Sequence, residues 1–113
     1  MNEEIIRLTN LWYRYVGMDH HKDRDCHFYI ECAYSYGDSP KYYAYHNGYR
    51  MDDWKTPIRK TFAEAEKDLE NKLHNEINSH ILEIQMRLSS NEEDFLISHE
   101  ELEQELKALR GEL

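Results

Sequence analysis

Apolar residues recur at steps of three and four over about seven helical turns in the second half of the chain. This stripe consists of Phe62, Ala65, Leu69, Leu73, Ile77, Ile81, Ile84 and Leu88. It predicts one amphipathic helix that begins at the capping-box sequence Thr61-Phe62-Ala63-Glu64 and ends at Ser89-Ser90-Asn91. Such a helix is roughly 40 Å long, which exceeds the length of a short sheet. The stripe from Ile77 onward must therefore be buried against a second helix or against another copy of the chain.

Charged and aromatic residues are segregated between the two halves of the 113-residue chain. Residues 1–60 contain nine acidic and nine basic residues, whereas residues 61–113 contain fourteen acidic and five basic ones. The second half therefore carries the whole net charge of −9. All nine tyrosines and both tryptophans lie in the first half. Because aromatic residues favour strands and Leu/Ala/Glu-rich runs favour helices, we expect one α+β domain with a tyrosine-rich sheet half (1–60) and an acidic helical half (61–113).

The predicted sheet is antiparallel, has three or four strands and follows a short helix at residues 2–9 that Asn2 caps. Residues 11–16 are rich in strand formers, and the point where helix gives way to strand is left open. The clearest strands span residues 26–36 and 42–46, and a short one at 49–51 follows the turn signal at 47–48. Alternation in the first of these strands places Phe28, Ile30 and Cys32 on the core face. A tight turn would place Cys32 opposite Tyr45 and Glu31 opposite His46.

A last helix is predicted from the capping box at residues 98–101 to Gly111. The longest apolar run, residues 42–45, is far shorter than the roughly 20 residues of a membrane-spanning helix. The acidic start Glu3-Glu4 is unlike a signal peptide, so we expect a cytoplasmic protein. Neither a glycine-rich phosphate loop nor a serine nucleophile motif occurs in the sequence. We therefore expect no enzyme, although the residue types leave a small acid–base site as an alternative.

The densest polar cluster of the sequence lies at residues 19–27 and suggests a metal site. Imidazole, thiolate and carboxylate groups are the ligands that zinc prefers. The candidate zinc ligands are His20, His21, Asp25, Cys26 and His27. A solvated loop without a metal is the alternative, because the spacing of these residues matches no standard zinc motif.

Two groups of residues are candidates for binding a partner. Clustered carboxylates attract a basic partner, and tyrosines are enriched in the centres of protein interfaces. The candidates are Glu92, Glu93, Asp94, Glu100, Glu101 and Glu103 among the acids, and Tyr13, Tyr15, Tyr29 and Tyr42 among the aromatics. The alternative is that the acids form an ordinary solvated helix face and the tyrosines complete the core.

The order of helix, strands and helix over residues 2–75 resembles the layout of double-stranded RNA-binding domains. Those domains grip phosphates through a lysine cluster at the start of their second helix. Here Arg59 and Lys60 precede the helix, which continues with Glu64, Glu66 and Asp68. Because binding to phosphates needs clustered cations, we expect no direct binding of nucleic acid.

Small size, acidity and the absence of a catalytic motif resemble the small inhibitors encoded by bacterial viruses, anti-CRISPR proteins among them. The resemblance rests on size and composition. It implies a noncatalytic inhibitor of a nucleic-acid-handling enzyme such as a CRISPR nuclease. The protein would bind a basic host protein through its acidic helices or its aromatic sheet face. A zinc-stabilised domain with a structural role and a small enzyme are the alternatives, and the long helix predicts either a helix hairpin or a homodimer.

Overall fold

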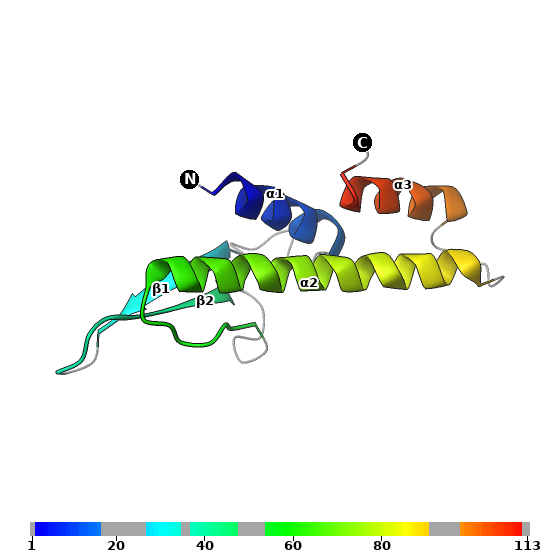
Figure 1. Cartoon of the computed structure of the whole chain (residues 1–113). Helices are drawn as coiled ribbons and strands as arrows, with labels where there is room; N and C mark the ends of the chain where they lie inside the picture. Colours follow the sequence, from blue (N-terminus) through cyan, green and yellow to red (C-terminus); the bar gives the residue numbers. More distant parts are fainter. Residues whose placement is uncertain (1, 17–26, 35–36, 48–53, 91–97, 112–113) are drawn as a thin grey trace.

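The computed structural model describes residues 2–16, 27–34, 37–47, 54–90 and 98–111 of the chain. In chain order these form helix α1 (Glu3–Leu11), the π-helical turn η1 (Trp12–Val16), strands β1 (His27–Ala33) and β2 (Lys41–Asn47), and helices α2 (Phe62–Ser89) and α3 (His99–Leu109). Helices α1 and α3 lie one after the other along α2, and the β1–β2 hairpin lies against the N-terminal half of α2 (Figure 1). The predicted α+β class and order of helices are confirmed.

Local side-chain caps set the starts of the three α-helices at the predicted positions. Asn2, Thr61 and Ser98 each accept a hydrogen bond at 3.2 Å from the backbone N–H three residues later. These bonds satisfy donors that the first helical turn cannot pair internally. At the other end of α3, Gly111 has a φ of 75° and donates its N–H to the Ala108 carbonyl at 3.1 Å. Glycine adopts this left-handed conformation without steric cost, which ends the helix.

The apolar stripe of α2 forms the spine of the core. Its fully buried members are Ala65, Leu69, Leu73, Ile77 and Ile84, and Ile81 and Leu88 pack partly against them. Phe62 departs from the prediction, because it is 51% exposed and contacts the Tyr42 ring edge-on at 6.3 Å. From Ile77 onward, the core cluster also contains Leu102 and Leu109 of α3. The second half of the stripe is therefore covered by α3 of the same chain.

Residues 11–16, predicted as strand formers, continue the N-terminal helix. Trp12 follows Leu8 by one helical turn, and both side chains are 1% exposed. The Trp12 indole lies 5.0 Å from the Phe28 ring and 6.4 Å from the Trp54 ring, measured between centroids. Burying Trp12 on the same stripe as Leu8 stabilises the helical path more than the β propensity of these residues opposes it.

The register of the hairpin differs from the prediction by three residues. Cys32 lies opposite Tyr42 and not Tyr45, because the strand pairing ends at Ala33 and Lys41. An odd shift exchanges the two faces of a strand. Ala44 and His46 of β2, both 0% exposed, therefore face the core. The small side chain of Ala44 allows α2 to approach the sheet closely, which a tyrosine at this position would prevent.

Residues 54–59 run along the second edge of β2. Thr56 donates its N–H to the Ala44 carbonyl at 2.9 Å, and Arg59 and Tyr42 exchange backbone hydrogen bonds at 2.7 and 2.8 Å. The Ala44 N–H, however, donates to the Thr56 hydroxyl at 2.7 Å, and Pro57 has no N–H. This segment therefore forms isolated bridges. The described residues form a two-stranded sheet, not the predicted three or four strands, and the predicted strand at 49–51 lies outside them.

Candidate functional site

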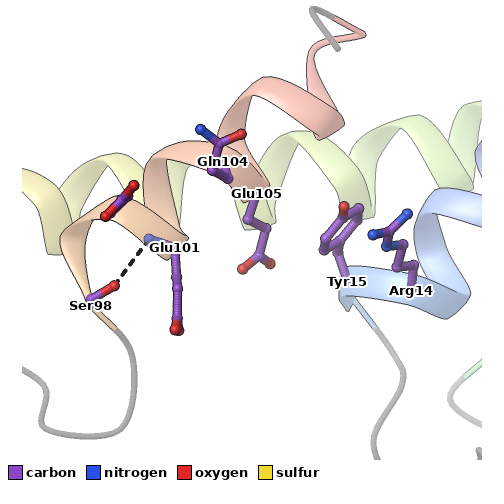
Figure 2. A pocket seen from close by; sticks show the side chains of 7 residues that line it. Arg14, Tyr15, Ser98, Glu101, Gln104 and Glu105 are labelled. Carbon is purple, nitrogen blue, oxygen red and sulfur yellow. Dashed lines mark hydrogen bonds between the residues drawn. The ribbon is translucent and has the colours of Figure 1, made fainter.

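An open groove of about 510 Å³ lies between η1 and the first two turns of α3. Its walls are Arg14, Tyr15, Ser98, Glu100, Glu101, Gln104 and Glu105. Figure 2 shows Tyr15 and Arg14 on one wall, with Glu105 and Glu101 projecting from α3 on the other. The groove exists because η1 continues the helical path of α1 toward α3. A strand at residues 11–16 would have placed Tyr15 elsewhere.

Each wall of the groove contains one close side-chain contact. The Arg14 guanidinium lies 5.2 Å from the centroid of the Tyr15 ring, which is a cation–π distance. On the other wall, Glu105 Oε1 lies 2.6 Å from His80 Nε2 of α2. Both partners of this contact are about one-fifth exposed. Glu105 is therefore fixed by α2 and positions α3 along the groove.

Glu100 and Glu101 supply the exposed charge of the groove. Both lie in the first turn of α3, where the helix dipole favours carboxylates. Within the described residues, no cation forms an ion pair with either carboxylate.

The structure brings together three of the residues predicted to bind a partner, namely Tyr15, Glu100 and Glu101. Glu103 is exposed on α3 but does not line the groove. The predicted residues Glu92, Glu93 and Asp94 lie outside the described residues. Arg14 and Gln104 were missed, because their positions beside the acidic cluster depend on how α3 packs against α2 and η1.

The other three predicted tyrosines do not form one aromatic patch. Tyr13 packs edge-on against Trp12 at 5.5 Å and its hydroxyl lies 3.4 Å from His46 Nε2. Tyr42 lies on the core face of the sheet beside Phe62, and Tyr29 lies on the opposite face. The three tyrosines therefore lie in three different environments and do not share one surface.

Tyr29 belongs to an aromatic ladder on the outer face of the sheet. It stacks on Tyr45 with ring centroids 5.3 Å apart, and Tyr45 lies 5.8 Å from Tyr43. The Tyr43 hydroxyl donates to the Glu31 carboxylate. Tyr43 and Tyr45 were not among the predicted binding residues, because the predicted register places them on the core face.

The predicted pairing of His46 with Glu31 and the predicted burial of Cys32 are both wrong. His46 lies opposite Phe28 and its ring is 4.5 Å from the Phe28 ring, inside the core. Cys32 is exposed, one residue before the end of β1. A hydrogen bond with Cys32 raises the pKa of both Tyr34 and Tyr42. Cys32 therefore lies at the surface, whereas the prediction placed it among core side chains.

Of the predicted zinc ligands, only His27 is among the described residues. It is exposed at the start of β1, with its ring 5.9 Å from Tyr29. His20, His21, Asp25 and Cys26 lie outside the described residues. In the part of the chain that is described, no three His, Cys, Asp or Glu side chains gather around a position suited to a metal ion.

Glu76 is a half-buried carboxylate that belongs to the core rather than to the groove. Burial raises its pKa above the ordinary 4.5, while hydrogen bonding from Trp12, the charge of Lys72 and hydrogen bonding from Trp54 act in the opposite direction. The positive charge of Lys72 partly offsets the buried negative charge of Glu76, and the same ammonium lies 5.0 Å from the Trp54 ring centroid.

Comparison with known proteins gave no match to a family model, a curated protein or a solved structure. None of the helices in the described residues combines the length and apolar character needed to cross a membrane. A function can therefore be inferred only from the structure and sequence of this chain.

Proposed function

We propose that the protein is a noncatalytic binding protein whose groove between η1 and α3 receives a basic segment of a partner. The observation that carries this proposal is the position of Glu100 and Glu101 beside Tyr15 in one open groove. A lysine or arginine side chain in this groove would meet the carboxylates of α3 on one wall and, on the other, the Tyr15 ring, which Arg14 also contacts. Carboxylates form charge-assisted hydrogen bonds with guanidinium and ammonium groups, and the aromatic ring supports the apolar part of such side chains.

The kind of partner follows from the distribution of charge. Residues 61–113 carry a net charge of −9, and α3 lies in this half. A surface of this sign accelerates encounter with a basic protein and repels the phosphates of nucleic acids. Proteins that handle nucleic acids expose basic channels for those phosphates. The proposed partner is such an enzyme, and the proposed effect is inhibition by occupation of its channel.

A peptide titration with matched variants tests the groove. The probe is an arginine nonapeptide, titrated by calorimetry at about 10 mM and about 300 mM salt. Glu100→Gln/Glu101→Gln removes the two exposed carboxylates. Glu3→Gln/Glu64→Gln is the control, because it makes the same change of charge in the first turns of α1 and α2. Glutamine also preserves the capping box at Thr61.

We expect the peptide to bind at low salt and to bind roughly 2- to 30-fold more weakly to the groove variant, at about 0.2–1 kcal/mol for each carboxylate. The control should bind within about twofold of the unaltered protein. An equal loss in both variants would show that net charge acts without the groove, and an absence of binding at low salt would also overturn the proposal.

The inhibitory step has its own test. The protein should displace a labelled DNA duplex from the same arginine peptide, which fluorescence anisotropy detects. The variant Glu100→Gln/Glu101→Gln should displace the duplex less effectively than the control variant. If the peptide binds but the duplex is not displaced, the groove is still a binding site. Inhibition by competition with nucleic acid would then be wrong.

A further inference from the structure

The second edge of β1 is open in the described part of the chain. Tyr42, Ala44 and His46 of β2 direct their backbone hydrogen bonds toward residues 54–59, away from β1. In an antiparallel pair, two residues directly opposite each other either both direct their backbone N–H and C=O groups toward the partner strand or both direct them away from it. Their partners Cys32, Ile30 and Phe28 therefore direct their N–H and C=O groups toward the outer edge of β1. No described residue forms a backbone hydrogen bond with that edge.

This edge lacks the features that normally prevent strands of different molecules from pairing. Edge strands are usually protected by lysine, proline, a β-bulge or great shortness. β1 has seven residues, pairs with β2 without a bulge, and contains neither lysine nor proline. Its one acidic residue, Glu31, accepts a hydrogen bond from Tyr43 of the same sheet. The other edge of the sheet is different, because residues 54–59, including Pro57, cover it.

We propose that β1 pairs antiparallel with β1 of a second copy of this chain, so that the two hairpins form one continuous sheet. The register with full overlap places Ile30 opposite Ile30 of the partner subunit. Phe28 then lies opposite Cys32 of the partner subunit, and Tyr29 lies opposite Glu31 of the partner subunit. All seven residues of β1 are paired in this register, and no two like charges face each other.

Other symmetric registers of these two edges are less favourable. A shift of the partner strand by two residues in one direction places Glu31 opposite its own copy, which is repulsive. A shift in the other direction leaves residues at the ends of β1 without a partner within the strand. The sequence His27–Ala33 therefore favours self-pairing centred on Ile30. Because a single strand edge buries less area than a standard stable interface, we expect a weak dimer that depends on concentration.

Amide hydrogen exchange measured by NMR tests the pairing in the unaltered protein. The N–H groups of Phe28, Ile30 and Cys32 should exchange slowly only at high concentration, by roughly tenfold between about 10 µM and about 1 mM. The N–H groups of Tyr29 and Glu31 face β2 and should be protected at every concentration. Sedimentation should show the mass rising from 13.7 kDa toward twice that value over the same range.

The substitution Cys32→Pro provides the matched perturbation. It removes an outward N–H without removing a β1–β2 hydrogen bond, and the exposed side chain of Cys32 contributes little to the core. Because the substitution removes this N–H from both copies, it should raise the dissociation constant of the dimer roughly 10- to 100-fold. Cys32→Ala keeps the N–H and removes the thiol, so it should dimerise normally under reducing conditions.

Several outcomes would overturn the proposal. A mass of 13.7 kDa at about 1 mM, or protection of Phe28, Ile30 and Cys32 at every concentration in a monomer, would exclude self-pairing. A dimer in which these amides exchange rapidly would use another surface, such as the exposed Leu82 and Met86 of α2. Should Cys32→Pro fail to fold, the exchange measurement on the unaltered protein still decides the question. The arginine-peptide titration is independent of these results.

Discussion

Leu102→Ala should detach α3 while the sheet half of the protein stays folded. Leu102 is 3% exposed and belongs to the core cluster that also contains Ile84 of α2. Truncating a buried leucine to alanine costs about 2–5 kcal/mol. The whole chain of 113 residues is expected to be stable by about 6–17 kcal/mol. An eleven-residue helix is marginal on its own, so this loss falls mainly on the docking of α3.

Hydrogen exchange with mass spectrometry measures this local opening. A loss of 2–5 kcal/mol corresponds to roughly 30- to several-thousand-fold faster exchange through opening of α3, at about 1.4 kcal/mol for each factor of ten. Leu82→Ala is the matched control, because it is the same chemical change at a position that is 61% exposed on α2. Surface substitutions of this kind usually change stability by less than about 0.5 kcal/mol.

The pattern of protection across the chain decides whether this reasoning holds. Faster exchange confined to α3 and the facing part of α2 would support it, and the groove should lose its peptide binding at the same time. Equal acceleration in β1, β2 and α1 would show that α3 unfolds only with the whole molecule. Exchange in α3 that matches the Leu82→Ala control would refute the packing of Leu102.

Three polar features give further predictions. Thr56→Val should lower the free energy of unfolding by about 1–3 kcal/mol in urea titrations, because the Thr56 hydroxyl accepts the buried Ala44 N–H; an unchanged midpoint would contradict this. The raised pKa of Glu76 means that the folded state holds this proton more tightly than the unfolded state, so its stabilising effect is complete below pH 4.5 and lost as the pH rises through the raised pKa. Glu76→Gln should therefore show a flatter dependence of stability on pH above 4.5, and an unchanged slope would refute the assignment. Native mass spectrometry after expression with zinc decides between a metal site and a solvated loop at residues 19–27: extra mass of about one zinc ion per chain, removed by a chelator together with the folded charge states, would support the metal site, and a metal-free mass would reject it.

The candidate groove was predicted in part. The clustered carboxylates Glu100 and Glu101 were recognisable from sequence, because first-turn acids after a serine cap form a local pattern. Tyr15 was one of four tyrosines predicted to bind a partner, but nothing in the sequence indicated that it would face α3. Arg14 was not recognised, since its role depends on η1 remaining helical. The groove joins residues that lie more than eighty positions apart, and no local pattern encodes such a distance.

Local sequence patterns were sufficient to predict where the helices begin and which face of α2 is buried. Asn2, Thr61 and Ser98 cap helices through hydrogen bonds that span three residues, so a short stretch of sequence is sufficient. The faces of β2, in contrast, depend on how the hairpin packs against α2. Residues 42–46 are mostly tyrosines, whose rings suit a core and whose hydroxyls suit water, so they contain no clear alternation. The fit of Ala44 beneath α2 fixed the register, because close packing of helix on sheet requires a small side chain there.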